Sequence, residues 1–349
     1  MKRRVGLAIL LMSLIMLVLA SLTAGAAGFR IALCNNYAGN TMRQSMIAAW
    51  ELSAKEAVSE GLIAEAPVFT STQPSAESQA ALLQSLILKK YDAIVINSAS
   101  SSSLNGIIKE AIDAGITVVS FDNNVTQEGT YNVITAFHDM GASELDYIHQ
   151  RFPEGANVFE IRGMAGTPGD EVIHSGIADG FAKYANLKKV GFVYGDWTET
   201  VAQKAVAGIV PSLPQVDAIV TQGGDGYGAV QAFEAAGRKI PVVVMGNRYD
   251  ELTLWKQLKD KDGYQTISMS TSPACSQVGF WVAYLVLKGE KVPHDLYYPT
   301  LTITSSNLDK AIADTPAGGT TVVNLDLSWV KQLVENSIKG VPAPPQVIK

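Results

Sequence analysis

Two stretches of the chain repeat one succession of elements, and this repeat restricts the fold more than any other feature. Residues 92–123 begin with Asp-Ala-Ile-Val and continue through a loop of small residues and a helical segment to a second apolar run that ends in Asn. Residues 217–247 begin with the same four residues and follow the same order. Strands and helices that alternate at these lengths are typical of an α/β fold with a parallel, doubly wound sheet. We therefore predict two lobes of similar topology. Their matching strand ends carry Asp122, Asn123, Asn247 and Arg248.

The first 26 residues have the composition of an export signal. Basic residues at 2–4 precede an apolar run at 5–19, and the small residues 24–26 have the form of a cleavage site. The alternative is a single transmembrane anchor, for which the apolar core is short. Cys34 lies within a strand pattern and is poorly placed for a lipid-modified cysteine. We expect cleavage near Ala26 and a soluble protein in the periplasm.

Charge and cysteine content limit the classes of function. The signal carries three cations and no acid, so the mature chain has 24 Lys and Arg against 33 Asp and Glu, a net charge of −9. An acidic exported chain gives no support for nucleic acid binding. Cys34 and Cys275 can form at most one disulfide in an oxidising compartment. We expect two buried free thiols instead, because Cys34 falls within a predicted strand.

The first strand and the loop after it have the features of a binding site. The apolar run 31–34 predicts a buried strand, and Asn40 is a suitable N-cap for a helix that begins near Thr41. The loop between them contains Asn36 and Tyr37. In α/β sheets, small ligands bind at the carboxyl ends of strands. We interpret this loop as one wall of a binding cleft; the alternative is an ordinary connection rich in turn-forming residues.

The polar residues at the predicted strand ends suit a ligand with many hydroxyl groups. Asp122 can accept hydrogen bonds from neighbouring hydroxyls, and Arg43 or Arg248 can donate two in a fork. The apolar face of a sugar ring packs on an aromatic side chain, which Trp197 or Tyr37 can supply. For Trp197 the alternative is a tryptophan of the core or rim.

Signals for catalysis are weak. The four histidines show no metal-binding spacing, and neither a GxSxG elbow nor a phosphate-binding loop is present. Residues 224–229 match the dinucleotide pattern G-x-G-x-x-A, but the next strand ends in Asn247-Arg248 rather than in an acid for a ribose. We interpret residues 224–229 as a glycine-rich turn. We expect no catalytic residue, metal or cofactor.

Four stretches of sequence together resemble the periplasmic sugar-binding proteins of ABC importers, the ribose-binding-protein-like group. They are RIALCNNYAGNTMRQ, AIDAGITVVSFDNN, EIRGMAGTPGDEVIHSGIADGF and VLKGEKVP, and the resemblance covers nearly all of the mature chain. It implies a type I periplasmic binding protein fold, in which two Rossmann-like lobes are joined by a three-strand hinge. Lac-repressor-type regulators share the lobes but carry a DNA-binding segment where this chain has its signal.

The resemblance also implies boundaries for the lobes. The N-terminal lobe would contain residues 28–136 and 271–299, and the C-terminal lobe residues 137–270 and 300–349. The chain has no Pro-, Gly- or Ser-rich linker between the lobes, which favours a hinge of short crossing strands over a flexible tether.

Several site residues follow from matching the family pattern. Asn36, Tyr37 and Asn40 match the first ligand loop, Asp122 matches the ligand-binding aspartate, and Trp197 matches a stacking aromatic residue. The remaining positions depart from the pattern or match it only approximately: Asn123, where Arg is common; Ile177, where the family has Arg; Asn247-Arg248, where it has Asp; and Gln222, near a family Asn but in a loop one residue shorter.

Two charged contacts of the family are therefore replaced in this chain. Arg43, Asp170 or Arg248 can compensate from other positions. Asp170 and Glu171 can also serve only as caps at the positive end of their helix. We therefore predict a ligand other than ribose itself.

We expect an exported, monomeric binding protein that captures a sugar or sugar-like polyol by hinge closure and delivers it to the membrane permease of an ABC transporter. One alternative is presentation of the ligand to a chemoreceptor or sensor kinase. Others are a nucleoside or another non-sugar metabolite as ligand, and an exported enzyme on this fold.

Overall fold

A parallel sheet occupies the N-terminal part of the molecule, whose computed structural model describes residues 28–39, 41–346 and 348. Among these residues, seven strands form this sheet in the order β12-β6-β5-β4-β1-β2, with β3 also paired to β1. The strands are β1 (Phe29–Asn35), β2 (Ile63–Glu65), β3 (Val68–Thr70), β4 (Ala93–Asn97), β5 (Thr117–Phe121), β6 (Tyr131–Thr135) and β12 (Asp295–Tyr298). Its helices are α2 (Thr41–Ser59), α3 (Ala76–Leu88), α4 (Asn105–Asp113) and α10 (Cys275–Leu287). We call this sheet and its helices the first lobe.

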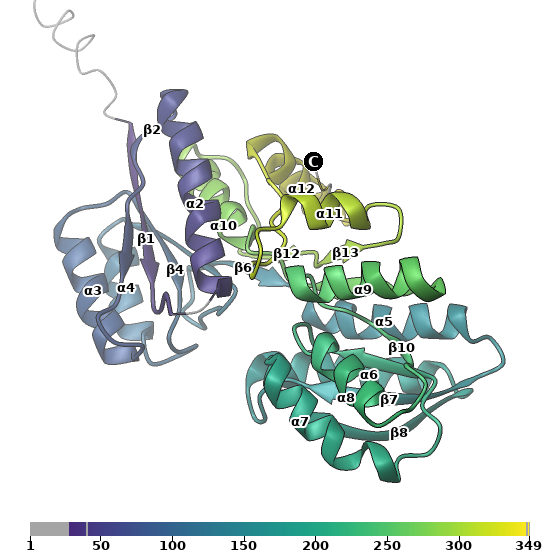
Figure 1. Cartoon of the computed structure of the whole chain (residues 1–349). Helices are drawn as coiled ribbons and strands as arrows, with labels where there is room; N and C mark the ends of the chain where they lie inside the picture. Colours follow the sequence, from purple (N-terminus) through teal and green to yellow (C-terminus); the bar gives the residue numbers. More distant parts are fainter. Residues whose placement is uncertain (1–27, 40, 347, 349) are drawn as a thin grey trace, which may run out of the picture.

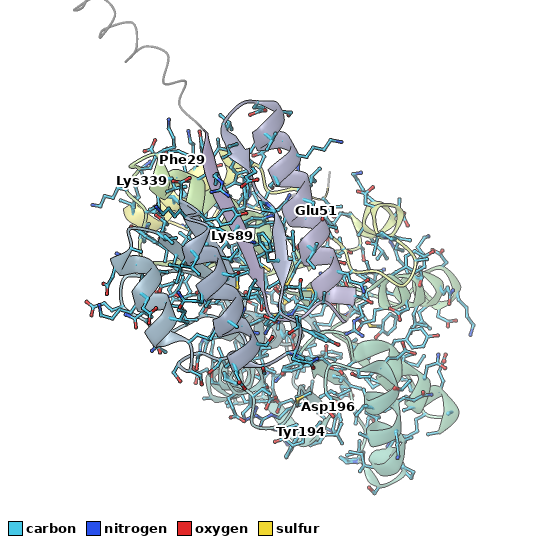
Figure 2. All side chains as sticks on the ribbon, turned by 90° about the vertical axis from the view of Figure 1, so that its left-hand side faces the viewer. Phe29, Glu51, Lys89, Tyr194, Asp196 and Lys339 are labelled. Carbon is cyan, nitrogen blue, oxygen red and sulfur yellow. The ribbon has the colours of Figure 1, made fainter. Side chains whose placement is uncertain are left out.

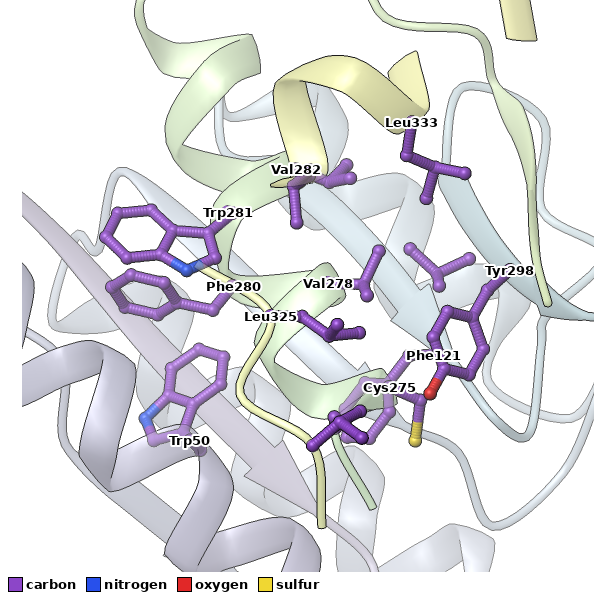
Figure 3. Close-up of a cluster of buried hydrophobic side chains, with 14 of the residues drawn as sticks. Trp50, Phe121, Cys275, Val278, Phe280, Trp281, Val282, Tyr298, Leu325 and Leu333 are labelled. Atoms are coloured by element: carbon purple, nitrogen blue, oxygen red, sulfur yellow. The ribbon is translucent and has the colours of Figure 1, made fainter. Parts of the chain in front are cut away.

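The side chains of β1 point alternately to the two faces of the first sheet, and different helices cover each face. Ile31 and Leu33 join a core with α2 and α10, whereas Ala32 and Cys34 join one with α3 and α4. Successive side chains of a strand point to opposite faces, so a fully apolar strand is buried on both. Figure 3 shows part of the first core, where the ring centroids of Trp50 on α2 and Phe280 on α10 lie 5.0 Å apart.

A second parallel sheet follows in the chain. Within the described range it has four strands, in the order β10-β9-β7-β8. These strands are β7 (Ala156–Arg162), β8 (Leu187–Tyr194), β9 (Ala218–Thr221) and β10 (Val242–Val243). One face packs on α5 (Phe137–Arg151) and α6 (Pro168–Lys183), and the other on α7 (Glu199–Ile209) and α8 (Gly226–Ala235). This second lobe lies at the lower right of Figure 1, and the α/β prediction of two doubly wound sheets is confirmed.

Three short segments connect the lobes between residues 41 and 303, as predicted: they lead from β6 to α5, from β11 (Ser268–Ser270) to α10, and from β12 to β13 (Leu301–Ile303). The chain is interrupted between β12 and β13 at Pro299, which has no N–H to donate to a ladder, and β13 pairs antiparallel with β11.

Two helices of the described chain were not predicted from the sequence. Helix α9 (Tyr249–Asp262) follows the second sheet, and α11 (Leu308–Asp314) packs against it. Many charged residues in α9 make its apolar stripe hard to recognise in the sequence, although Leu252, Trp255 and Leu258 are buried at helical spacing. The short strand β2, beside β1, was also not predicted.

The last helix lies against the first lobe. Helix α12 (Leu327–Lys339) packs on α10 and β12, and its Val330 and Leu333 belong to the core of the first sheet. Figure 3 shows Leu333 in this core with Tyr298 of β12. This packing differs from the predicted lobe division, which placed residues 300–349 with the second lobe. The buried apolar face of α12 explains the difference, because α10 and β12 provide the surface that covers it.

Two further expectations concern membranes and thiols. In residues 28–39, 41–346 and 348 no helix combines the length and apolar character needed to cross a membrane. The predicted export signal, residues 1–26, lies outside the described residues. Cys34 and Cys275 are both buried and free.

Candidate functional site

An ion pair lies at the carboxyl end of the first sheet. Asp122 directly follows β5, and Arg43 lies in the first turn of α2. Arg43 Nη1 donates to Asp122 Oδ2 over 2.6 Å, and each side chain is 14% exposed. Asn97, the last residue of β4, places its Nδ2 3.3 Å from the same oxygen. Two adjacent strand ends and the first turn of α2 thus bring a carboxylate, an amide and a cation together at the carboxyl edge of the sheet.

The backbone at Asp122 is unusual for a residue with a side chain. Its φ is +59°, in the left-handed region. Asp and Asn tolerate this region better than most residues, but it still has an energetic cost, and such conformations cluster at ligand sites. The left-handed turn directs the chain away from β5 immediately after the carboxylate.

Two asparagines flank the ion pair through a shared acceptor. Asn36 Nδ2 and Asn123 Nδ2 donate to the Ser98 carbonyl over 3.0 and 3.1 Å. Tyr37 is 39% exposed and lies over Gly39, where an added Cβ would come within 2.2 Å of the phenol oxygen. Asn36, Tyr37, Arg43, Asp122 and Asn123 thus gather at one edge of the first lobe. Asn40 lies outside the described residues.

A second polar cluster is built at the end of β7. Arg162 ends this strand and meets Asp170 of α6 through two contacts, Nε to Oδ1 at 3.1 Å and Nη2 to Oδ2 at 2.6 Å. Gln222 Nε2 donates to the same Oδ1 over 2.9 Å, and its Oε1 accepts from the Gly163 N–H over 2.9 Å. Although burial opposes the charged form, the bonds to Asp170 and Glu171 raise the pKa of Arg162.

This cluster is a rigid base rather than an open contact surface. Asp170 is fully buried and Gln222 is 5% exposed, so the side chains of both are committed to one another, to Arg162 and to Gly163. The sequence did not identify Arg162. The rule that found Asp122, a charged residue at the end of an apolar strand, would have found it.

Trp197 lies on this base. Asp196 and Trp197 follow β8 with φ of +54° and +52°. The indole lies so close to Gly163 that an added Cβ there would be 2.2 Å from its Cε2 atom. Arg248 Nη2 donates to the Trp197 carbonyl over 2.8 Å. Gly163 on one side and Arg248 on the other therefore hold the loop that contains Trp197. Figure 2 shows Tyr194 and Asp196, at the end of β8, at the opposite end of the view from Phe29 at the start of β1.

Buried acids surround the glycine-rich turn that resembled a dinucleotide loop. The guanidinium of Arg248 occupies the space where a Cβ of Gly224 would lie, 2.7 Å from its Cζ. Glu251 Oε1 accepts from the N–H groups of Gly226 and Gly246, each over 3.0 Å. Burial, reinforced by Glu251, raises the pKa of Asp225 well above its ordinary value. Side chains of the protein therefore fill this turn.

The hydrogen bonds of the two polar clusters each join residues of one lobe. Asn247 is buried as Asp170 is, but its Nδ2 donates to the Thr271 carbonyl in a connecting segment. Over the described part of the chain, no group of three or more His, Cys, Asp or Glu residues is arranged to hold a metal ion.

Comparison with known proteins identifies relatives over most of the chain. Residues 31–291 match the family described as periplasmic binding protein domain. The xylitol-binding protein of Mycolicibacterium smegmatis is 29% identical over 249 residues, which cover 70% of each chain. The D-ribose/D-allose-binding protein of Pseudomonas aeruginosa is 30% identical over 229 residues, 62% of this chain and 70% of that protein.

Solved structures agree with this assignment. An ABC transporter solute binding protein from Thermobispora bispora is 32% identical and superimposes with a TM-score of 0.77, covering 91% of this chain and 98% of that one. A solute binding protein from Actinobacillus succinogenes with bound D-allose shares the fold at 20% identity and a TM-score of 0.67, over 80% of this chain and 99% of that one. The chain therefore belongs to the periplasmic binding protein domain family.

Proposed function

We propose that the chain is an exported solute-binding protein that captures a sugar or sugar-like polyol between its lobes and delivers it to the permease of an ABC transporter. The observation that carries the proposal is the Arg43–Asp122 pair with its flanking amides. It combines a charge-assisted donor and acceptor at the carboxyl edge of a parallel sheet, which suits hydroxyl groups that both donate and accept. The named relatives bind xylitol, D-ribose and D-allose, which supports this ligand class.

The second lobe would supply the aromatic contact. Trp197 is partly exposed and supported from below by Gly163, so its position is fixed before a ligand arrives. A fixed aromatic surface reduces the entropy lost on binding. In this proposal Asp170 and Gln222 act as positioning residues beneath Trp197, and direct ligand contacts come from Asn36, Arg43, Asp122 and Trp197.

The remaining parts of the proposal concern location and chemistry. Cleavage near Ala26 would release a monomeric protein into the periplasm, and binding would proceed by closure of the lobes without chemical change of the ligand. The relatives are named as binding proteins, which supports the absence of catalysis. For the lobes we propose the predicted boundaries except at the C-terminus, where residues 321–346 belong to the first lobe because α12 packs there.

A ligand screen tests the proposal. The purified mature protein is denatured and the released small molecule identified by mass spectrometry, followed by thermal-shift measurements with xylitol, D-ribose, D-allose and a panel of nucleosides. A ligand present at 100 times its Kd stabilises the folded state by about 2.7 kcal/mol. We expect a sugar or polyol to raise the Tm and to be recovered unchanged. A shift with a nucleoside alone would overturn the ligand class, and turnover of the ligand would overturn the binding role.

A further inference from the structure

The segment 319–325 joins the second lobe to the first, and we call it the C-terminal strap. It lies beyond residues 31–291, which match the family. At its start, the Tyr249 N–H donates to the Gly319 carbonyl over 3.0 Å, and the Thr321 N–H donates to the Asn247 carbonyl over 2.9 Å. An antiparallel bridge pairs Thr320 with Arg248. The strap is thus attached to the loop between β10 and α9, beside the Trp197 loop.

The other end of the strap is fixed to α10. The Leu325 N–H donates to Gln277 Oε1 over 2.9 Å, and Gln277 Nε2 donates to Asn324 Oδ1 over 2.9 Å. Gln277 is fully buried. Val323 and Leu325 insert into the core of the first sheet, and Figure 3 shows Leu325 among the core side chains around α10. Within seven residues the chain passes from the loop between β10 and α9 to the core of the first lobe.

Asn247 connects the strap to a second crossing segment. Its backbone carbonyl accepts from Thr321, both from the N–H and from Oγ1 over 3.1 Å. Its side-chain Nδ2 donates over 3.0 Å to the Thr271 carbonyl, in the segment that leads from β11 to α10. The next residue, Arg248, donates to the Trp197 carbonyl. One buried asparagine therefore contacts two connections between the lobes and precedes the arginine that holds Trp197.

We propose that the C-terminal strap is a fourth connection in the hinge, counted within residues 41–346, and that Asn247 is a positioning residue that ties it to the β11–α10 segment. Asn247 thereby sets how far the lobes separate and where Arg248 holds Trp197. Only this last consequence, for the ligand, rests on the proposed function. The effect on lobe separation stands on the contacts of the strap alone.

The reach of the strap explains how it limits opening. Thr321, bonded to Asn247, is followed three positions later by Asn324, bonded to Gln277. An extended chain spans at most about 3.5 Å per residue, so these two anchor points are at most about 10 Å apart along the strap. Rotation of the lobes that would stretch this distance requires one of the anchoring bonds to break. Removal of an anchor should therefore allow wider opening of the ligand-free protein.

Distance measurements between spin labels test the proposal without any ligand. Labels are placed on Leu88→Cys in the first lobe, where the side chain is 74% exposed, and on Lys188→Cys at the exposed start of β8. The native cysteines are fully buried, and a protein without the two new cysteines checks that they stay unlabelled. The interlobe distance distribution is then recorded by double electron–electron resonance for each variant.

Two variants weaken the ties of the strap and one provides a matched control. Asn247→Ala removes the side-chain bond that ties this loop to Thr271 and keeps the carbonyl that accepts from Thr321. Asn324→Ala removes one of the two hydrogen bonds that join the strap to Gln277. Asn157→Ala removes a similar amide-to-carbonyl bond, to Gln215 over 2.9 Å, that lies within the second lobe. We expect both anchor variants to shift the distribution to longer and more widely spread distances. The control should retain the distribution of the parent protein.

Two results would overturn the proposal: anchor variants with the parent distribution, or a control that broadens it equally. If Asn247→Ala does not fold, Thr321→Val tests the attachment of the strap to the Asn247 carbonyl, because it removes only the hydroxyl bonds and keeps the backbone one. A ligand screen that finds no sugar would contradict the proposed function and leave this distance measurement unaffected.

Discussion

The contact between Trp197 and Gly163 allows the aromatic part of the site to be tested with a single methyl group. In Gly163→Ala the new Cβ would lie 2.2 Å from Trp197 Cε2. Carbon atoms in contact prefer about 3.7 Å, so the indole must retreat by about 1.5 Å. The backbone at Gly163 does not have a positive φ, and its N–H, which donates to Asp170 and Gln222, is kept. The substitution therefore acts mainly on the ring.

The expected loss of affinity follows from the value of aromatic packing. Such contacts contribute about 0.5–1.5 kcal/mol beyond the area they bury, which corresponds to a loss of about 2- to 12-fold in affinity. Isothermal titration calorimetry with the ligand found by the screen measures this loss. Tryptophan fluorescence, compared with a Trp197→Phe variant, reports whether the ring has moved.

Gly169→Ala is the matched control. Its Cβ would lie 3.8 Å from Trp197 Cζ2, an ordinary van der Waals contact, and alanine is favoured over glycine within a helix such as α6. We expect this variant to bind as the parent does. If the fluorescence shows a displaced indole in Gly163→Ala while the affinity is unchanged, Trp197 is not part of the binding site.

Three further predictions concern charge and thiol chemistry. Asp122→Asn, which tolerates the left-handed backbone but loses the ion pair with Arg43, should weaken ligand binding at least tenfold with an unchanged circular dichroism spectrum; equal affinity would remove Asp122 from the site. Burial raises the pKa of Glu144 well above its ordinary 4.5, so the folded state holds this proton more tightly and stability falls as pH rises above 4.5. In urea unfolding, Glu144→Gln should therefore gain stability relative to the parent with rising pH, and a constant difference would contradict this. Burial raises the pKa of Cys34 to about 12, so at pH 8 Ellman's reagent should not modify it in the native protein and should do so after unfolding.

Elements and site residues could be predicted from the sequence where the local pattern of apolar residues matches their burial in the fold. The fully apolar strand at Ile31–Cys34 could be identified because both faces of the first sheet are covered, and Asp122 could be identified because it ends a similar strand. In these cases short-range signals contain the information that the fold uses.

Other features depend on contacts between distant residues and could not be read locally. Asp170 was a candidate ligand contact, but Arg162 and Gln222 enclose it only after β7, α6 and β9 have assembled. Asn247 was predicted at a strand end, as Asp122 was, yet it lies in the loop after β10, and its amide donates to Thr271, 24 residues later in the chain. A polar residue at a predicted strand end is expected to lie at the edge of a sheet. Its position in the sequence does not show whether it binds a ligand or another part of the protein.

The return of the C-terminal strap to the first sheet has a consequence for the order of assembly. The second sheet and its helices come from one continuous stretch, from α5 to β10, and can form before the C-terminal residues are available. The core around α10 needs Val323, Leu325 and Leu333, which follow the whole second sheet in the chain. The half of the protein that is synthesised first is therefore completed last, and it exposes apolar surface until the final turns of α12 have emerged.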